Sequence, residues 1–220
     1  MEQSMNRYIG QMLDDRYEIL EIIGSGGMSV VYKAMCHKLH RYVAVKILRD
    51  EMAADAELKN RFQAEAHAVA MLSQPNIVSV YDVSRGETEY IVMELIEGIT
   101  LKQYMEQKGT LNWREALHFI TQIMKALAHA HSRGIIHRDI KPENIFISDN
   151  RDYKLGDFGI ARTIERTSSG LSKKGTYSYM APEVYIGKKY GFSVDTYSLG
   201  LVLYRMLNKN RGSFLPQPPE

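Results

Sequence analysis

Apolar and polar residues alternate along the first half of the chain in short runs. Three runs between residues 17 and 48 read YEILEIIG, SVVYKAMC and RYVAVKIL, with three glycines near the first junction. Such alternation is typical of β-strands, and glycines between the runs favour a tight turn. Two more runs, IVSVYDV (77–83) and YIVMEL (90–95), are separated by the turn-forming SRGETE. The pattern predicts a five-stranded antiparallel sheet.

A helical pattern interrupts these strands between Asp55 and Leu72. Its stripe recurs at spacings of four and three, at Leu58, Phe62, Glu65, Val69 and Leu72. A buried carboxylate is costly unless a cation pairs with it. A partly exposed Glu65 at the edge of the stripe is therefore the simpler interpretation, and a specific partner would reverse it.

The pattern becomes mainly helical after Glu94. A helix is expected to begin at Asn112, with Glu115 at the capping-box position, and to stop at Gly134. Another is expected over residues 193–208, with two short strands flanking the polar loops between the two helices. We predict an α+β chain with a seam near residues 94–98. Its parts are an extension (1–16), a sheet lobe (17–96) and a larger helical lobe (97–220).

Composition narrows the class of protein. The 220 residues are 45% hydrophobic and 25% charged, which allows a sizeable core. A formal charge of +2 gives no indication of a nucleic-acid partner. Cys36 is the only cysteine, so neither an intrachain disulfide nor a cysteine zinc site is expected. We expect a cytoplasmic chain with no signal peptide and no membrane span.

The tract IHRDIKPENIFISDNRDYKLGDFG, from residue 136 to residue 159, carries the most informative chemistry. Asp139 and Asn144 lie five residues apart in a polar turn, and Asp157 follows a short apolar strand. Hard divalent cations prefer carboxylate and amide oxygens and keep substrate phosphates as further ligands. Two of these residues can therefore hold Mg²⁺ while the third faces a nucleophile.

The glycine turn IIGSGGMSVVY is a weak signal by itself. A strand follows it, whereas a dinucleotide fingerprint would open a helix, and the Gly-Lys-Ser/Thr of a Walker A loop is missing. Alternation places Lys46 on an otherwise apolar strand face with Tyr42, Ala44 and Leu48. A lysine that protects an edge strand from aggregation is the alternative.

These motifs, in this order, resemble the eukaryotic-type (Hanks-type) serine/threonine protein kinase domains in their bacterial GGMS-loop form. HRDIKPEN resembles the catalytic loop, DFG the metal loop, AVK the lysine strand and APE the end of the activation segment. Ser29 replaces the third glycine of the loop, as in other GGMS-type kinases. The resemblance covers residue 17 to the end, over nine tenths of the chain, and implies a bilobal kinase fold that ends before its last helices.

The resemblance implies a role for each motif residue. Asp139 would be the catalytic base, Lys141 would neutralise the transferred phosphoryl group, and Lys46 would pair with Glu65 and hold the α- and β-phosphates. Asn144 and Asp157 would bind Mg²⁺, or Mn²⁺. The ATP-binding positions would be Ile23, Gly24, Ser25, Gly26, Gly27, Val31, Ala44, Lys46, Met93 (gatekeeper), Glu94, Ile96 and Phe146.

Regulatory and supporting residues follow from the same resemblance. Phosphate on an activation-segment hydroxyl would pair with Arg138, although a merely flexible polar loop is an equal alternative. The hydroxyls are Thr167, Ser168, Ser169 and Ser172, and Thr176 would contact Asp139 and Lys141. His137 and Phe158 would pack together near Val69, Asp195 would brace the catalytic loop, and Glu183 would await an arginine. The histidines at positions 37, 40, 129 and 131 predict no metal site.

The predicted function is ATP-dependent phosphorylation of protein serine and threonine hydroxyls. Lys141 favours these acceptors over tyrosine, and self-association for autophosphorylation is expected. The alternative is an inactive nucleotide-binding fragment acting as a regulatory module. The missing last helices favour that alternative, whereas the presence of Lys46, Asp139 and Asp157 favours the enzyme. Missing helices would also leave apolar surface on helix 193–208 and lower stability, and a longer protein could be tethered to a membrane beyond residue 220.

Overall fold

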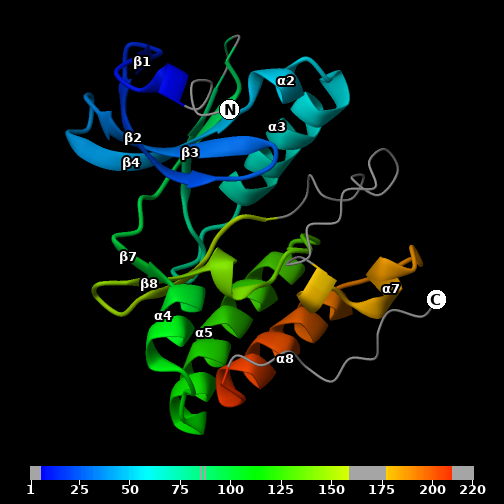
Figure 1. Cartoon of the computed structure of the whole chain (residues 1–220). Coiled ribbons are helices and arrows are strands. Elements are labelled where there is room, and N and C mark those ends of the chain that lie inside the picture. The colour runs from blue at the N-terminus through cyan, green and yellow to red at the C-terminus, as the bar shows by residue number, and fades with distance from the viewer. Residues whose placement is uncertain (1–5, 85, 87, 159–176, 210–220) are drawn as a thin grey trace. The chain divides into compact units, whose positions relative to one another are not determined.

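The computed structural model describes residues 6–84, 86, 88–158 and 177–209 of the chain. They form two compact units, whose elements are labelled in Figure 1. The first comprises the described residues of Met1–Ser73 and of Val78–Leu95. The second comprises Gln74–Ile77 and the described residues of Ile96–Glu220.

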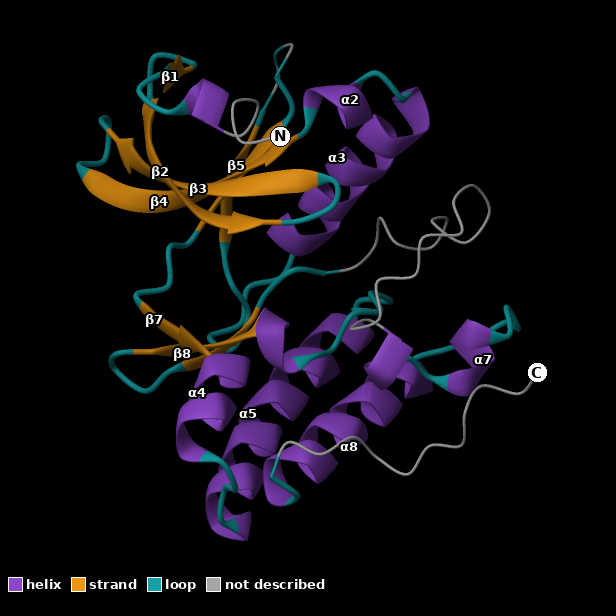
Figure 2. Ribbon diagram, in the orientation of Figure 1, coloured by secondary structure: helices purple, strands orange, loops and turns teal. Residues whose placement is uncertain are grey.

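The first unit is built on an antiparallel sheet with strand order β1-β2-β3-β4-β6-β5. Figure 2 draws its strands in orange. Its strands are β1 (Met12–Leu13), β2 (Tyr17–Ser25), β3 (Ser29–Cys36), β4 (Arg41–Leu48), β5 (Val80–Val83) and β6 (Tyr90–Met93). The prediction of five strands was wrong by one. The sixth strand, β1, has only two residues, so it is too short to show any alternation.

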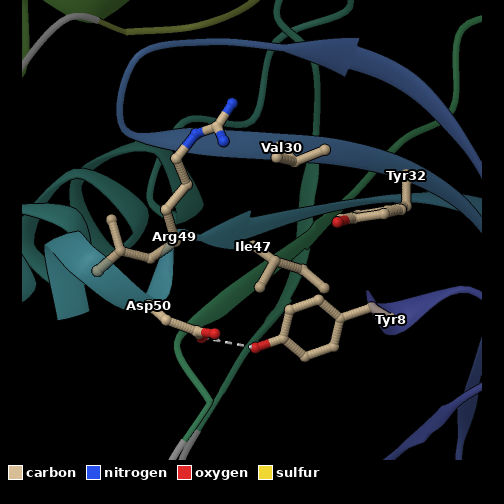
Figure 3. Close-up of a pocket in the computed structure, with 7 residues that line it drawn as sticks. Tyr8, Val30, Tyr32, Ile47, Arg49 and Asp50 are labelled. Atoms are coloured by element: carbon tan, nitrogen blue, oxygen red, sulfur yellow. Dashed lines mark hydrogen bonds between the residues drawn. The ribbon is translucent and has the colours of Figure 1, made fainter. Parts of the chain in front are cut away.

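One face of this sheet packs against the N-terminal segment. The 3₁₀ helix η1 (Asn6–Tyr8) and β1 contribute Tyr8 and Leu13 to an apolar cluster that contains Tyr17, Tyr32 and Val45. Tyr8 also donates a hydrogen bond to Asp50 (3.1 Å). Figure 3 shows the pocket beside this contact, which is lined by Tyr8, Val30, Tyr32, Ile47, Leu48, Arg49 and Asp50. The described residues of the predicted extension, 6–16, therefore contribute to the packed structure of this unit.

Helices α2 (Asp50–Ala53) and α3 (Ala56–Ala70) follow β4. The side chain of Asp55 caps α3 by accepting from the backbone N–H groups of Glu57 (2.9 Å) and Leu58 (3.3 Å). Phe62 and Ala66 of α3 pack with Leu48 and Ile91 of the sheet. Three residues of the predicted stripe, Phe62, Glu65 and Val69, are buried on α3. Leu58 is only partly buried, and Leu72 lies beyond the end of the helix.

Residues 74–77 join the second unit instead of extending β5. The backbone N–H of Leu155 donates to the Asn76 carbonyl (2.8 Å), and the Asn76 amide donates to the Tyr153 carbonyl (2.8 Å). Ile77 forms a parallel bridge with Leu155. The predicted strand over 77–83 is shortened to β5: Ile77 pairs with β9 instead, and residues 78 and 79 precede β5 in the first unit.

The second unit contains a small antiparallel sheet of order β7-β8-β9. The strands are β7 (Gly98–Thr100), β8 (Ile145–Ser148) and β9 (Tyr153–Leu155). β8 and β9 are the two short strands expected beside the polar loops, and β7 was not predicted. Gly98 allows β7 to approach β8 closely, because a Cβ atom at this position would lie 2.0 Å from the Ile147 carbonyl oxygen.

Helices complete this unit: α4 (Leu101–Lys108), α5 (Trp113–His131), η2 (Pro142–Asn144), η4 (Tyr177–Tyr179), α7 (Pro182–Tyr185) and α8 (Ser193–Leu207). Asn112 caps α5, as predicted, by accepting from the Glu115 backbone N–H (3.0 Å). Helix α8 buries Val194, Leu199, Val202 and Met206, and its Leu207 is exposed. Among the described residues, none of the helices has the length and apolar character needed to cross a bilayer.

Candidate active site

Lys46 and Glu65 form an ion pair inside the first unit. Lys46 projects from β4, and its Nζ lies 3.1 Å from Oε1 of Glu65 on α3. Only 13% of the lysine side chain and 8% of the glutamate side chain are exposed. The interpretation of Glu65 as a partly exposed residue at the edge of the stripe is therefore wrong. Each charge compensates the desolvation of the other, and removing one partner would leave a buried unpaired charge.

The glycine-rich turn joins β2 to β3 in the same unit. Its backbone closes through a hydrogen bond from the Gly26 N–H to the Ser29 carbonyl (2.8 Å). The turn leads into β3, and Val31 of β3 pairs with Lys46 of β4. Lys46 therefore lies on the strand next to the one that follows the turn. Ile23, a predicted contact of the nucleotide, is a large apolar side chain that is 47% exposed.

The residues expected to bind adenine are divided between the two units. Val31, Ala44, Met93 and Glu94 belong to the first unit, and Ile96 and Phe146 belong to the second. Ala44 pairs with Met93 across β4 and β6. The Glu94 N–H donates to the Ser79 carbonyl (2.9 Å), so a ligand contact of the Glu94 backbone would use its carbonyl oxygen. Binding of ATP by these residues stays a prediction.

Asp139, Lys141 and Asn144 meet in the second unit. Asn144 Nδ2 donates both to the Asp139 carbonyl oxygen and to Asp139 Oδ2, each at 2.8 Å. Lys141 Nζ lies 2.9 Å from the same carboxylate oxygen. Both partners of the Asn144 amide nitrogen are acceptors, so the amide oxygen is the atom of this side chain that could coordinate a cation. The sequence tract thus gathers a base, a cation and an oxygen donor.

Asp195 of α8 holds the start of this loop. Its two carboxylate oxygens accept from the backbone N–H groups of His137 and Arg138, each at 2.8 Å, and His131 Nε2 lies 2.8 Å from Oδ2. Arg138 has a left-handed backbone with φ of 68°, which is unfavourable for a residue with a side chain. The buried carboxylate therefore contacts a strained segment at the position where the bracing role of Asp195 was predicted.

His137 connects the catalytic loop to the segment before Asp157. Its Nε2 lies 2.9 Å from the Gly156 carbonyl, and the Asp139 N–H donates to its Nδ1 (3.2 Å). These contacts select the neutral tautomer that carries the proton on Nε2. Burial lowers the pKa of His137, which also favours the neutral ring. Its ring packs on Phe158 with centroids 4.5 Å apart, so the predicted pairing of these two residues is present.

Asn144 and the segment before Asp157 are tied together by the backbone. The Gly156 N–H donates to the Asn144 carbonyl (2.9 Å), and the next residue, Asp157, has a left-handed φ of 51°. Carboxylate and amide oxygens suit Mg²⁺ or Mn²⁺. The described residues contain no cluster of three or more His, Cys, Asp or Glu side chains suited to a metal. This donor set fits a hard cation that keeps water or phosphate ligands instead of one enclosed by protein.

Comparison with known proteins decides the family. The family model described as protein kinase domain matches residues 17–214. The chain belongs to the protein kinase domain family. It is 46% identical over 202 residues to a probable serine/threonine-protein kinase of Clostridium perfringens, covering 90% of this chain and 30% of that protein. It is 45% identical over 205 residues to the serine/threonine-protein kinase PrkC of Bacillus subtilis, covering 90% of this chain and 31% of that protein.

Solved kinase structures agree with this placement. The crystal structure of the Mycobacterium tuberculosis PknI kinase domain is similar with a TM-score of 0.75 at 30% identity. The match covers 95% of this chain and 82% of that one. The chain is a kinase domain of the bacterial serine/threonine type, and it spans about a third of the length of the curated relatives named above.

One contact of this kinase domain was not predicted, and some predicted residues lie outside the part of the chain that the structure describes. His131, interpreted from the sequence as a surface or packed residue, contacts Asp195 from α5, and only its position near the end of a helix hinted at a charged partner. The proposed regulatory hydroxyls Thr167, Ser168, Ser169, Ser172 and Thr176 lie outside the described residues. The Arg138 guanidinium lies 5.8 Å from the centroid of the Tyr190 ring, and Glu183 lies in α7.

Proposed function

We propose that this domain transfers the γ-phosphoryl group of ATP to serine and threonine hydroxyls of proteins. The observation that supports the proposal best is the cluster of Asp139, Lys141 and Asn144. A carboxylate held by an amide and a lysine provides a base of fixed orientation beside a positive charge. Phosphoryl transfer depends mainly on such positioning and on stabilisation of charge.

Asp139 accepts the proton of the substrate hydroxyl as that oxygen attacks phosphorus. Its carboxylate is only 8% exposed, and two neighbours hold it, so little reorganisation is needed during the reaction. Lys141 neutralises charge on the phosphoryl group in transit and favours serine or threonine as acceptor. Lys46, fixed by Glu65, holds the α- and β-phosphates.

Asn144 and Asp157 would hold Mg²⁺ through their amide and carboxylate oxygens. The bound cation neutralises negative charge on the phosphates of the nucleotide. Asn144 is suited to this role because its nitrogen is occupied by Asp139, which turns the amide oxygen away from that carboxylate. The glycine turn receives the phosphates through backbone N–H groups.

The acceptors proposed for this domain are proteins, including a second copy of this chain. Autophosphorylation would then occur on activation-segment hydroxyls, and Arg138 would pair with the added phosphate. The candidate hydroxyls are Thr167, Ser168, Ser169 and Ser172. The inactive, nucleotide-binding alternative predicts ATP binding without transfer.

Transfer of labelled γ-phosphate from ATP to the chain and to a general protein substrate tests the proposal. We expect label on phosphoserine and phosphothreonine after acid hydrolysis, and no label when EDTA removes divalent cations. Nucleotide binding without any transferred label would support the alternative. Label found only on phosphotyrosine would contradict the role given to Lys141.

A further inference from the structure

Arg49 contacts the glycine-rich turn from the end of β4. Its Nε and one terminal nitrogen donate to the Gly26 carbonyl oxygen, at 3.2 Å and 3.0 Å. The same terminal nitrogen lies 2.9 Å from Ser25 Oγ. The backbone N–H of Arg49 donates to the Met28 carbonyl (2.9 Å). One residue therefore binds the turn at three of its positions.

The direction of the side chain fits this role. In Figure 3 the guanidinium of Arg49 and the carboxylate of Asp50 point in opposite directions. Asp50 contacts Tyr8, whereas Arg49 contacts the β2–β3 turn. Arg49 is half-buried, and its hydrogen bonds to the turn lie at the surface. A guanidinium is planar and offers several donors in a fixed fork, which allows it to hold two neighbouring acceptors at once.

The turn needs such support because of its composition. Glycines lose more conformational freedom on ordering than other residues, so a glycine-rich turn is easily disordered. Within the turn itself, the Gly26–Ser29 hydrogen bond closes the backbone. The Arg49 contacts attach that closed turn to β4, the strand that also carries Lys46.

We propose that Arg49 is a positioning residue that keeps the glycine-rich turn in the shape that receives the phosphates of ATP. The proposal rests on the proposed function, because it assigns the turn to phosphate binding. Arg49 acts through Ser25 and Gly26 and takes no part in the chemical step. Loss of its contacts should therefore weaken nucleotide binding more than it slows transfer.

Amide hydrogen exchange tests the contact without nucleotide and without activity. Arg49→Met keeps most of the apolar stem and removes the donors. We expect the Gly26 amide to exchange about fivefold to tenfold faster in this variant. The matched control is Arg41→Met at the other end of β4, where the guanidinium lies over the Tyr81 ring. Unchanged exchange of Gly26 in Arg49→Met would overturn the proposal.

Steady-state kinetics test the consequence for ATP. We expect Arg49→Met to raise KM for ATP about fivefold while kcat stays within about twofold of the original chain. Arg49→Lys should be intermediate, because an ammonium group cannot reproduce the fork. Equal KM values for Arg49→Met and the original chain would contradict the proposal, as would full activity at original KM in Arg49→Lys.

A double-mutant cycle separates a positioning role from general damage. Ser25→Ala removes one acceptor of the Arg49 fork. If the two residues act together, the combined variant should raise KM by less than the product of the two single changes. Independent effects, or a fall in kcat that accompanies a lower melting temperature, would count against the proposal. If the original chain transfers no phosphate, the proposed function fails, and the exchange experiment still decides whether Arg49 holds the turn.

Discussion

Replacement of Asp195 by asparagine removes the charge that holds the catalytic loop and changes the side-chain shape little. The carboxylate is 1% exposed and accepts from the backbone N–H groups of His137 and Arg138, with His131 as a third neighbour. Asparagine has one acceptor oxygen and one NH₂ group. One of the two backbone N–H groups would therefore face another donor.

The size of the effect follows from these contacts. A hydrogen bond to a charged group contributes about 1.5–3 kcal/mol, and a buried donor without a partner costs a further 1–3 kcal/mol or so. One bond is lost outright and the others lose their charge, so we expect the free energy of unfolding to fall by about 2–4 kcal/mol. The left-handed Arg138 would no longer be held, and displacement of Asp139 would lower kcat about a hundredfold.

Urea unfolding followed by far-ultraviolet circular dichroism measures the loss of stability, because the helices of the second unit contribute strongly to that signal. The control is Asp149→Asn, which makes the same chemical change at an exposed position beyond β8. If Asp195→Asn unfolds at the same urea concentration as Asp149→Asn and transfers phosphate equally fast, the bracing role of Asp195 is refuted.

Two further substitutions test the fold of the second unit. Gly98→Ala should lower the free energy of unfolding by about 3 kcal/mol or more, because its Cβ would overlap the Ile147 carbonyl. The control is Gly109→Ala, because Gly109 has a φ of 76° and no atom lies near the added methyl group. This substitution should lower the free energy of unfolding by only about 1–2 kcal/mol. Equal losses of stability for the two variants in urea unfolding would contradict the overlap at Gly98. Asn112→Ala should cost about 1 kcal/mol by removing the cap on the Glu115 N–H, and Asn112→Ser should restore most of it, since its hydroxyl can accept the same bond.

Local patterns in the sequence predicted most of the sheet of the first unit. The predicted runs contain the observed strands β2, β3, β4 and β6. Burial alternates along β2 and β3, whereas consecutive residues are buried in β4 and β6, so the apolar character of those two runs carried the prediction. The same reasoning left two odd residues, Lys46 and Glu65, whose pairing the family resemblance implied and the structure contains. The sequence showed that each is a charged residue on an otherwise apolar face. It could not show that the two side chains lie close enough to pair.

The missed features depend on contacts that no local pattern encodes. Strand β1 has two residues, and its identity comes from pairing with β2. Ile77 was predicted as the first residue of a strand over 77–83, but it pairs with Leu155 of β9 and belongs to the other unit. His131 and Arg49 look like ordinary surface residues in the sequence. Their roles arise from partners 64 and 23 residues away, at Asp195 and Gly26.

The most direct test of phosphoryl transfer by this domain is the initial rate of γ-phosphate transfer from Mg-ATP by Asp139→Asn. Asparagine keeps the shape of the side chain but cannot act as a base. We predict a rate about 10²- to 10⁴-fold below that of the original chain, with Asp149→Asn unchanged. Equal rates for Asp139→Asn and the original chain would contradict the assignment of this domain as a kinase that uses Asp139.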